Sequence, residues 1–457
     1  MAPKDSPRRV IIMGAAGRDF HNFNMRYRDD PNTRVVAFTA TQIPGIANRS
    51  YPPALAGPLY TQGIPILEEG GFEALCQHES VDEVVFAYSD LAHEEVMHLG
   101  SRALSVGCDF TLLGPATTMI EATVPVIAVS AVRTGCGKSQ TVRWLADLLR
   151  RRGVKPAVIR HPMPYGELSR QAMQRFAKMA DLDDAECTIE EREEYEPHIA
   201  TGTVVYAGVD YAPIVRNAAR ESDVILWDGG NNDFPFIRPD LHIVLVDSLR
   251  PDQVTSHHPG EAALRMADVV VLAKTDVADA EDLTRLAEEI EMLIPSTPIV
   301  HAASPVTLDP PESLAGKNVL VIEDGPTITH GGMAYGAGYI AARRAGAAHI
   351  IDPRPFATPP LNKIFSAYPH IGAVLPAIGY GPAQLEALAQ TISACPADAV
   401  VVATPVSLDK LMAIDKPVLR VRYAFAEAGT PGLTRITEDF LDLWEIGTMT
   451  EKPDDAN

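Results

Sequence analysis

Cysteine is scarce in this chain, and its few cysteines are not spaced to bind a metal or to form a disulfide framework. The five cysteines are spread over the whole length, and no two of them form a CxxC pair. This pattern argues against a disulfide-stabilised secreted domain and against a cysteine-ligated zinc site. We therefore predict a reduced, cytoplasmic protein.

Long apolar runs are also missing. No uncharged apolar stretch approaches the ~18 residues that a membrane-spanning helix needs. The N-terminal stretch Met-Ala-Pro-Lys-Asp-Ser-Pro-Arg-Arg contains no apolar core of the signal-peptide type. We therefore expect neither a signal peptide nor a membrane span.

Basic residues are fewer than acidic ones in this chain. The chain has 39 Lys and Arg against 60 Asp and Glu, which gives a formal net charge of −21. This balance argues against nonspecific binding of nucleic acid, but a small polyanionic substrate stays open if basic side chains converge locally. With 457 residues, 46% of them hydrophobic, the chain is long enough for two to four domains.

The strongest motif in the chain is Val126–Thr141, where a β-branched run leads into a glycine loop and then into periodic apolar positions. This order predicts a buried strand, a phosphate-cradling loop and an amphipathic helix. Gly135 and Gly137 allow backbone N–H groups to approach a polyphosphate closely. Lys138 is predicted to reach the β- and γ-phosphates, and the hydroxyl of Ser139 to bind Mg²⁺.

The loop departs from the usual GxxxxGK[ST] pattern, because Val132 stands where the first glycine is expected. Its compact Thr-Gly-x-Gly-Lys-Ser core resembles the loop of dethiobiotin-synthetase-like and metallochaperone-like NTPases. We predict that a nucleoside triphosphate, ATP with GTP left open, binds here. The predicted contacts are Thr134, Gly135, Cys136, Gly137, Lys138, Ser139 and Gln140.

A second polar turn follows the apolar strand predicted at 223–227 and begins with Asp228. An aspartate at the end of a strand downstream of a P-loop is typical of the Walker B position. Asp228 is therefore predicted to hold Mg²⁺ together with Ser139. The Gly- and Asn-rich turn that continues to Asp233 admits a plain strand-end turn as the alternative.

Further cations follow other predicted strands. Arg160 and His161 end the strand that begins after Gly153, and Arg250 follows the strand at 242–246. Because ligands of open α/β sheets bind beyond the carboxyl ends of the strands, we expect these side chains to face the substrate. Lys138, Arg160, His161 and Asp228 are the predicted catalytic residues of this edge.

The segment after the strand at 268–273 resembles the NKxD base-recognition motif, with Ala273 in place of Asn. Lys274 and Asp276 are therefore predicted to contact the base of the nucleotide. A plain strand-end turn is an equal alternative, and the substitution leaves both adenine and guanine open.

The N-terminal region alternates strands with helical spacing, which predicts a Rossmann-like domain with a parallel sheet. Its first loop, at 14–24, lacks the third glycine of a dinucleotide fingerprint, and no acidic residue follows the second strand. NAD(P) binding is therefore disfavoured. The basic loop is predicted instead to form an anion-binding lip through Arg18 and His21, with a solvated surface loop as the alternative.

Two more segments carry chemistry or charge. In the glycine-rich loop at 323–338, Glu323 and Asp324 are predicted to bind substrate and His330 to act in catalysis. The acidic stretch at 181–196 is predicted to be a helical hairpin or lid with a solvated face.

The fold class predicted from these patterns is α/β. An N-terminal Rossmann-like domain at 1–124 precedes a P-loop NTPase domain with a mostly parallel sheet at 125–305 and a C-terminal α/β region at 306–457. The stretch at 304–314, rich in Pro, Ser and Ala, is interpreted as a linker.

Five segments in this order resemble the cyclic 2,3-diphosphoglycerate synthetase family, and the resemblance extends over nearly the whole chain. They are GAAGRDFHNFN at 14–24, SAVRTGCGKSQT at 130–141, RHPMPYG at 160–166, WDGGNNDFPF at 227–236 and EDGPTITHGGMAYGAG at 323–338. The resemblance implies a P-loop NTPase with an added N-terminal nucleotide-binding-like domain, and typically a homodimer.

The resemblance further implies that ATP and Mg²⁺ are used to close 2,3-diphosphoglycerate into its cyclic pyrophosphate, with release of ADP and phosphate. Such a reaction brings anion to anion, so the site has to neutralise charge and hold the groups in line. The candidates for the substrate side are Arg18, His21, Arg160, His161 and Arg250.

Two other functions remain open. The segment with Lys274 and Asp276 also admits guanine, so the second hypothesis is a regulatory or metallochaperone-type GTPase acting on a protein partner. The absence of a Cys/His metal cluster argues against it. The third is a nucleotide-sensing scaffold that binds a partner through its first domain.

Overall fold

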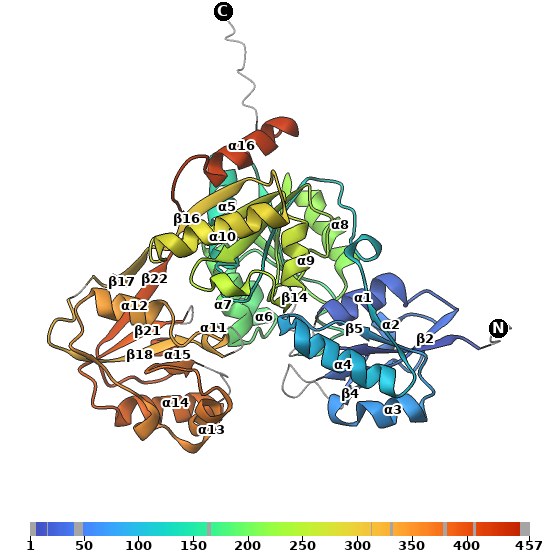
Figure 1. Ribbon diagram of the computed structural model, residues 1–457, viewed down its shortest axis with the longest axis horizontal. Helices are drawn as coiled ribbons and strands as arrows, with labels where there is room; N and C mark the ends of the chain where they lie inside the picture. Colours follow the sequence, from blue (N-terminus) through green and yellow to red (C-terminus); the bar gives the residue numbers. More distant parts are fainter. Residues whose placement is uncertain are drawn as a thin grey trace, which may run out of the picture.

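The computed structural model describes residues 6–15, 17–40, 49–161, 166–311, 313–329, 332–377, 382–404 and 408–447. In these ranges the chain forms three α/β units, each built on a mostly parallel sheet (Figure 1). The N-terminal unit (blue) and the unit at 306–423 (orange) flank the unit that carries the P-loop (teal to yellow). The predicted α/β class is confirmed, whereas the predicted domain boundaries stay a prediction.

The first sheet has the strand order β3-β4-β2-β1-β5-β7, and only β3 runs antiparallel to its neighbour. Val10 and Ile12 of β1 pack with α1 on one face, while Ile11 and Met13 pack with α3 and α4 on the other. Alternation of this kind is what a sheet covered on both faces requires. The elements are β1 (Arg8–Met13), α1 (Arg18–Arg26), β2 (Thr33–Ala40), β3 (Ser50–Tyr51), α2 (Pro53–Ala56), β4 (Ile64–Glu68), α3 (Phe72–His78), β5 (Glu83–Phe86), α4 (His93–Ser105) and β7 (Asp109–Leu112).

The second sheet has the order β10-β11-β9-β12-β8-β13-β15-β16-β23, with the P-loop strand β8 between β12 and β13. Only the edge strands β10 and β23 are antiparallel to their neighbours. Its strands are β8 (Val126–Ala131), β9 (Pro156–Arg160), β10 (Gln174–Phe176), β11 (Val204–Ala207), β12 (Val224–Asp228), β13 (Leu241–Asp247), β15 (Val269–Ala273), β16 (Ile299–Ala303) and β23 (Ala426–Glu427).

Helices cover both faces of this second sheet. Ile127 and Val129 of β8 face α5, whereas Val126 and Ala128 face α8. A strand buried on both faces reads as the continuous apolar run that the sequence shows. The helices of this unit are α5 (Lys138–Arg151), α6 (Met179–Asp184), α7 (Ile189–Ala200), α8 (Tyr211–Glu221), α9 (Gly260–Arg265) and α10 (Ala280–Leu293).

The third sheet has the order β17-β22-β21-β18-β19, with β20 also paired to β18. Its elements are β17 (Val306–Asp309), β18 (Asn318–Asp324), α11 (Gly325–Ile328), α12 (Ala337–Arg344), β19 (His349–Ile350), α13 (Pro359–Ala367), β20 (Leu375–Ala377), α14 (Pro382–Ala394), β21 (Ala399–Ala403), α15 (Leu408–Leu411) and β22 (Val418–Tyr423). The linker interpretation of 304–314 is wrong in part, because β17 pairs antiparallel with β22. A short strand at the edge of a sheet can be largely polar, so its sequence does not show the apolar pattern by which strands are predicted.

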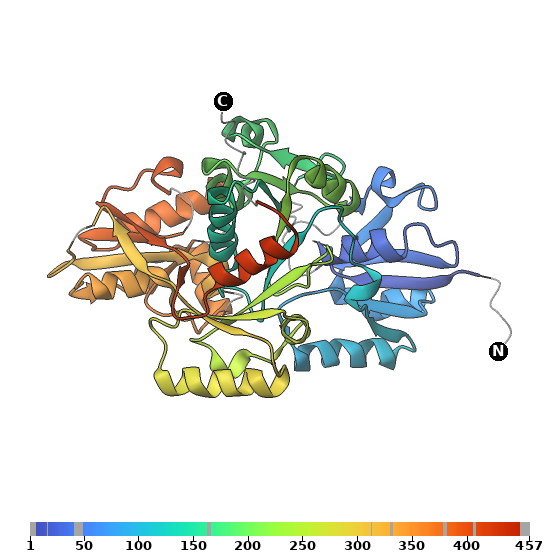
Figure 2. The same ribbon diagram turned by 90° about the horizontal axis from the view of Figure 1, so that it is seen from above.

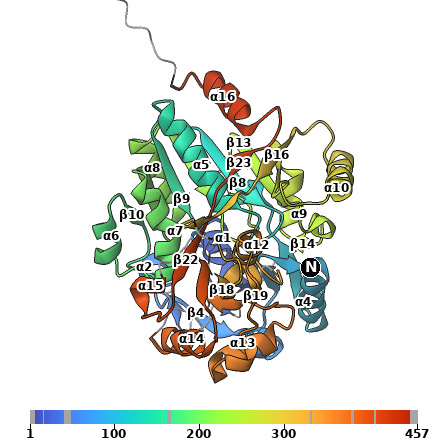
Figure 3. The ribbon, with the colours of Figure 1, turned by 90° about the vertical axis from the view of Figure 1, so that its left-hand side faces the viewer.

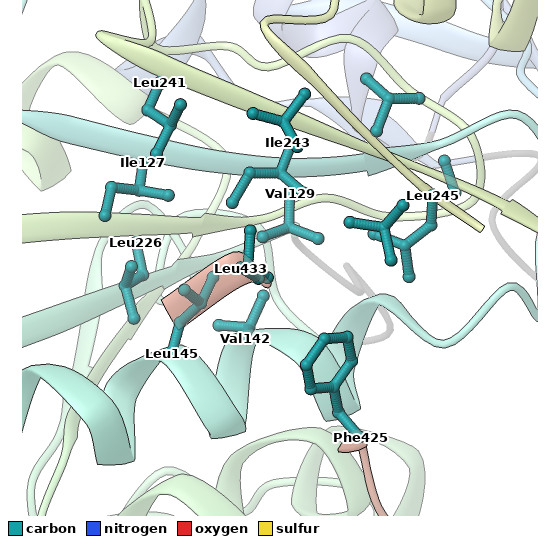
Figure 4. Packing of buried hydrophobic residues seen from close by; sticks show 14 of the residues in the cluster. Ile127, Val129, Val142, Leu145, Leu226, Leu241, Ile243, Leu245, Phe425 and Leu433 are labelled. Carbon is teal, nitrogen blue, oxygen red and sulfur yellow. The ribbon is translucent and has the colours of Figure 1, made fainter. Parts of the chain in front are cut away.

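After β22 the chain returns to the P-loop unit. β23 pairs with β16, and α16 (Leu433–Leu443) lies across this unit, as Figure 2 shows in red. Phe425 and Leu433 join the core beside Val142 and Leu145 of α5 (Figure 4). The end of the chain therefore stabilises the helix that follows the phosphate loop.

The acidic stretch forms α6 and α7, as the predicted helical hairpin requires, but its predicted solvated face is wrong for α7. Glu191, Tyr195 and His198 are buried, and α7 packs against α5 and β11. Figure 3 labels α5 and α7 beside the strands of the second sheet. The buried positions recur at intervals of three and four residues, which is the spacing of one helix face.

None of the helices formed by the described residues combines the length and the apolar character that crossing a bilayer requires.

The fold makes one steric prediction at the start of α9. A Cβ added at Gly260 would lie 2.0 Å from the carbonyl oxygen of Val132, at the beginning of the phosphate loop. We expect Gly260→Ala to lower the free energy of unfolding by about 1–3 kcal/mol through overpacking, measured by urea denaturation. Gly114→Ala is the matched control, because a Cβ there meets nothing within 4 Å. Equal stability of the two variants would contradict the expected clash.

Candidate active site

The phosphate loop connects β8 to α5 and is shaped by two glycines. Gly135 has φ +83° and Gly137 has φ +108°, a region that side chains other than glycine rarely adopt. Lys138 opens α5, is buried, and donates a hydrogen bond to the carbonyl oxygen of Asn231. Burial lowers the pKa of this lysine. The strand, loop and helix follow one another in the order that phosphate binding requires.

Two cations support the loop through its carbonyl groups. Arg250 Nη2 donates to Thr134 O at 2.7 Å, and Lys274 Nζ donates to Gly135 O at 2.9 Å. Both cations are also paired with the buried carboxylate of Asp247 at the end of β13. Arg250, predicted on the substrate side, is therefore placed against the loop itself.

Asp276, the second residue of the predicted base-reading segment, is already engaged. Its Oδ1 accepts a hydrogen bond from Ser304 N at 2.9 Å, and Arg344 Nη2 lies 3.8 Å from Oδ2. One carboxylate oxygen thus accepts a hydrogen bond from the segment after β16, and the other lies near an arginine of α12.

Asp228 lies at the end of β12 and is fully buried. Arg160 Nη1 lies 2.7 Å from Oδ1, and His198 Nε2 lies 3.9 Å from Oδ2. Within the described part of the chain neither carboxylate oxygen has a hydrogen bond of good geometry. Burial by itself would raise the pKa of this carboxyl, but Arg160, His198 and Lys138 outweigh it, so the pKa is lowered. Asp228 is therefore an anion that faces cations.

Helix α7 supplies side chains to this site that the sequence prediction missed. Glu194 Oε2 lies 2.5 Å from Arg160 Nη2 and 3.4 Å from the hydroxyl of Ser139. Glu193 accepts a hydrogen bond from Thr404 of the third unit at 3.0 Å. The i,i+4 spacing of Glu194 and His198, which both reach the site, was the available signal.

His161 brings three motifs together. Its ring is held between Gly17, in the first loop of the chain, and Gly230, in the turn after β12, because a Cβ on either glycine would lie within 2.6 Å of it. His161 Nε2 lies 3.3 Å from Asp233 Oδ2. Asp233 is also paired with Arg18, and both of these side chains are buried. The N-terminal loop is thus joined to the P-loop unit by packing and by charge.

His21 does not form the exposed basic lip that the sequence analysis expected. Its ring stacks on Phe236 with a centroid distance of 4.2 Å, and Nε2 lies 2.8 Å from the carbonyl oxygen of Thr118. Burial lowers the pKa of His21 to about 3, so the ring is neutral. Arg18, the other predicted member of the lip, is buried against Asp233.

The third unit approaches the phosphate loop through α11. A Cβ built on Gly135 would lie 3.8 Å from Thr327 Cγ2. Thr327 is bonded to Asp324, which accepts from its hydroxyl at 2.7 Å. Glu323 is used within the unit, because its carboxylate accepts hydrogen bonds from the backbone N–H groups of Gly336, Gly338 and Tyr339. Burial raises the pKa of Glu323 to about 7.

The structure therefore gathers Lys138, Ser139, Asp228 and Arg160 at one edge of the second sheet, with His161 beside them. Lys274 and Arg250 donate hydrogen bonds to backbone carbonyl groups of the phosphate loop. The carboxylate of Glu323 accepts its hydrogen bonds from the backbone of the third unit. The predicted catalytic residue His330 lies outside the described residues. The individual roles assigned from the sequence stay predictions.

No family model matches the chain. The arginine synthetase ArcE of Thermococcus kodakarensis is 56% identical over 433 residues, which cover 95% of this chain and 97% of ArcE. The cyclic 2,3-diphosphoglycerate synthetase of Rubrobacter xylanophilus is 24% identical over 263 residues, which cover 52% of this chain and 59% of that enzyme. Both relatives are synthetases, so the predicted enzyme class, an ATP-dependent ligase, is confirmed. The resemblance to the cyclic 2,3-diphosphoglycerate synthetases is confirmed only as a distant one.

A solved structure, that of LpxK from Aquifex aeolicus in complex with ATP, covers 76% of this chain and 95% of its own at 16% identity, with a TM-score of 0.43. A TM-score below 0.5 is too low to establish a shared fold.

The buried histidine beside Phe236 predicts a pH dependence of stability. The pKa of His21 is about 3 in the folded protein, against 6.5 for an ordinary histidine. As the pH falls from 6 to 4, this imidazole therefore gains a proton only in the unfolded chain. Stability should therefore fall in this window, by up to about 1.4 kcal/mol per pH unit for this group. His21→Gln should flatten the slope, measured by urea denaturation at several pH values. The exposed His78→Gln is the control, and an identical slope in both variants would contradict the assignment.

Proposed function

The chain belongs to the family of the Thermococcus kodakarensis arginine synthetase ArcE, and we propose that it forms arginine at the expense of ATP. The proposal is supported by identity that extends over nearly the full length of both chains. It is also supported by the charges around the phosphate loop, which suit this substrate better than a polyanion.

The chemistry of arginine formation fits a P-loop enzyme. The amino acid citrulline carries a ureido group where arginine carries its guanidinium. Transfer of the γ-phosphoryl group to the ureido oxygen forms one P–O bond, breaks another and releases ADP. Ammonia then attacks the carbon, the C–O bond breaks, and phosphate leaves with the electron pair and a proton of the ammonia. Both steps depend on holding the reacting groups in line rather than on a protein nucleophile.

The observation that carries the choice of substrate is the pairing of buried charge. Four buried arginines surround the phosphate loop, and each forms an ion pair with a buried aspartate. These pairs are Arg18–Asp233, Arg133–Asp90, Arg160–Asp228 and Arg250–Asp247. These guanidinium groups are already neutralised, so beyond the contacts that ATP itself requires they offer little net attraction to a second substrate with several phosphate charges.

Carboxylates of α7 lie on the side of the site that faces the third unit. Glu193 and Glu194 project from α7 toward this unit, and Glu194 is near enough to Asp324 to help burial raise the pKa of that carboxyl. A zwitterionic amino acid that becomes a cation on reaction is compatible with such surroundings.

The residues of the P-loop edge have distinct roles in this proposal. The ammonium group of Lys138 and the amides after Gly135 bind the phosphate tail, and Arg160 moves between Asp228 and the transferred phosphoryl group. Ser139 and Asp228 would hold Mg²⁺, and they fit it because the buried oxygens of Asp228 lack hydrogen bonds of good geometry. Bound Mg²⁺ would neutralise negative charge on the phosphate oxygens during phosphoryl transfer.

We propose ATP rather than GTP as the nucleotide. A guanine base is recognised by a carboxylate whose two oxygens are free to accept hydrogen bonds. One oxygen of Asp276 already accepts a hydrogen bond from Ser304 N, and Arg344 lies 3.8 Å from the other. This engagement also disfavours the GTPase alternative.

The cyclisation of 2,3-diphosphoglycerate is the second candidate, supported by the distant match to the Rubrobacter xylanophilus enzyme. One assay separates the two reactions. The protein is incubated with ATP and Mg²⁺, together with either citrulline and ammonium or 2,3-diphosphoglycerate, and ADP, phosphate and amino acids are quantified. We expect ADP formation and arginine only with citrulline and ammonium. ADP formation that depends on 2,3-diphosphoglycerate would replace the proposal with cyclisation. GTP hydrolysis that is unaffected by citrulline with ammonium and by 2,3-diphosphoglycerate would replace it with the regulatory GTPase.

Removal of single cations tests the phosphate-binding roles. Lys138→Ala and Arg160→Lys should each lower kcat by about 10²-fold or more, because charge stabilisation of the transferred group is lost or misplaced. The measurement is ADP formation at saturating citrulline and ammonium. Arg152→Ala, which removes an exposed arginine of the turn after α5, is the control and should leave kcat unchanged. Full activity of Arg160→Lys would remove a planar guanidinium from the proposed mechanism.

A further inference from the structure

A turn of the first unit reaches the phosphate loop of the second. Asp90, just beyond β5, has Oδ1 2.7 Å from Arg133 Nε, and its Oδ2 accepts a hydrogen bond from Thr134 N at 3.3 Å. The side chains of Asp90 and Arg133 are 5% and 6% exposed. One carboxylate therefore holds both the side chain and the backbone at the start of the loop.

The turn is fixed to the second unit by backbone contacts. β6 (Leu91–Ala92) pairs antiparallel with β14 (His257–His258), and Asp90 N donates to His258 O at 2.9 Å. Asp90 N also lies 2.8 Å from the side-chain oxygen of the buried Asn232. Asp90 has φ +63°, a left-handed conformation that is uncommon for residues other than glycine and persists where the surroundings determine it.

The same turn also touches the residue that holds Lys138. Asn231 donates from Nδ2 to the hydroxyl of Ser89 at 3.0 Å, and its carbonyl oxygen accepts the hydrogen bond of Lys138. Asn231 Oδ1 lies 3.5 Å from the hydroxyl of Thr134. The turn at 89–90 is thus linked to the beginning of the phosphate loop and to its lysine.

We propose that Asp90 is a positioning residue for nucleotide binding, so that the first unit completes the ATP site. By holding Arg133 and Thr134, the carboxylate keeps the amides from Gly135 onward directed at the phosphates. Ser89 holds the side chain of Asn231, whose carbonyl oxygen accepts the hydrogen bond of Lys138 and so positions its ammonium group. The proposal concerns ATP binding alone, so it does not depend on arginine being the product.

Two substitutions at Asp90 separate positioning from stability. Asp90→Asn keeps the shape of the side chain and tolerates the left-handed conformation, but removes the charge. Asp90→Gly removes the carboxylate and relaxes the backbone. We expect each variant to raise the Kd for ATP, measured by calorimetry in the absence of other substrates, by about tenfold to a hundredfold. In steady state the KM for ATP should rise more than kcat falls.

A matched control and a double variant complete the test. Asp109→Asn removes an exposed aspartate paired with Arg8 in the same unit, and its Kd for ATP should stay within twofold of the wild type. Arg133→Gln should also weaken ATP binding, and the loss in the double variant should be smaller than the sum of the two single losses, because both changes break the same ion pair.

Unchanged ATP affinity in Asp90→Gly and Arg133→Gln would overturn the proposal. So would additive losses in the double variant, which would indicate two independent structural roles. Should Asp90→Asn fail to fold, Asp90→Gly and Arg133→Gln still decide the question. A protein that binds ATP normally but makes no arginine would contradict the proposed function and leave this inference standing.

Discussion

Positive charge that is buried has to be paired, and this requirement governs the surroundings of the phosphate loop. Each buried arginine there has an aspartate partner, as in the Arg160–Asp228 and Arg250–Asp247 pairs. Removing one member of such a pair costs about 3–5 kcal/mol, because the other charge is left without compensation in a medium of low dielectric constant. Pairs such as Arg18–Asp233 and Arg133–Asp90 join loops that are distant in sequence.

The pairing also limits what the site can bind. The paired guanidinium groups are already neutralised, whereas Lys138 and the loop amides suit the phosphate tail of a nucleotide. Carboxylates of α7 add negative charge toward the third unit, where Glu193 contacts Thr404. The site thus combines a compact loop suited to binding an anion with carboxylates of α7.

The three units are joined by segments that cross between them. β6 of the first unit pairs with β14 of the second, and β23 and α16 return from the third sheet to the core beside α5. Helix α11 brings Thr327 to the phosphate loop. These crossings place the ends of strands from all three sheets around one loop, so the site belongs to no single unit.

Much of the architecture was determined by the sequence alone, because apolar periodicity and glycine spacing act locally. The α/β class, the strand–loop–helix around Lys138 and the position of Asp228 at a strand end follow from such short-range patterns. Only the tertiary structure decided which charges meet. Asp90 and Arg133 are far apart in the chain, and nothing in the residues around Asp90 marks it as a partner of the phosphate loop. The acidic stretch of α7 likewise reads as solvated until the cations it faces are known. Ion pairing depends on distance in space and on burial, and a linear sequence carries neither.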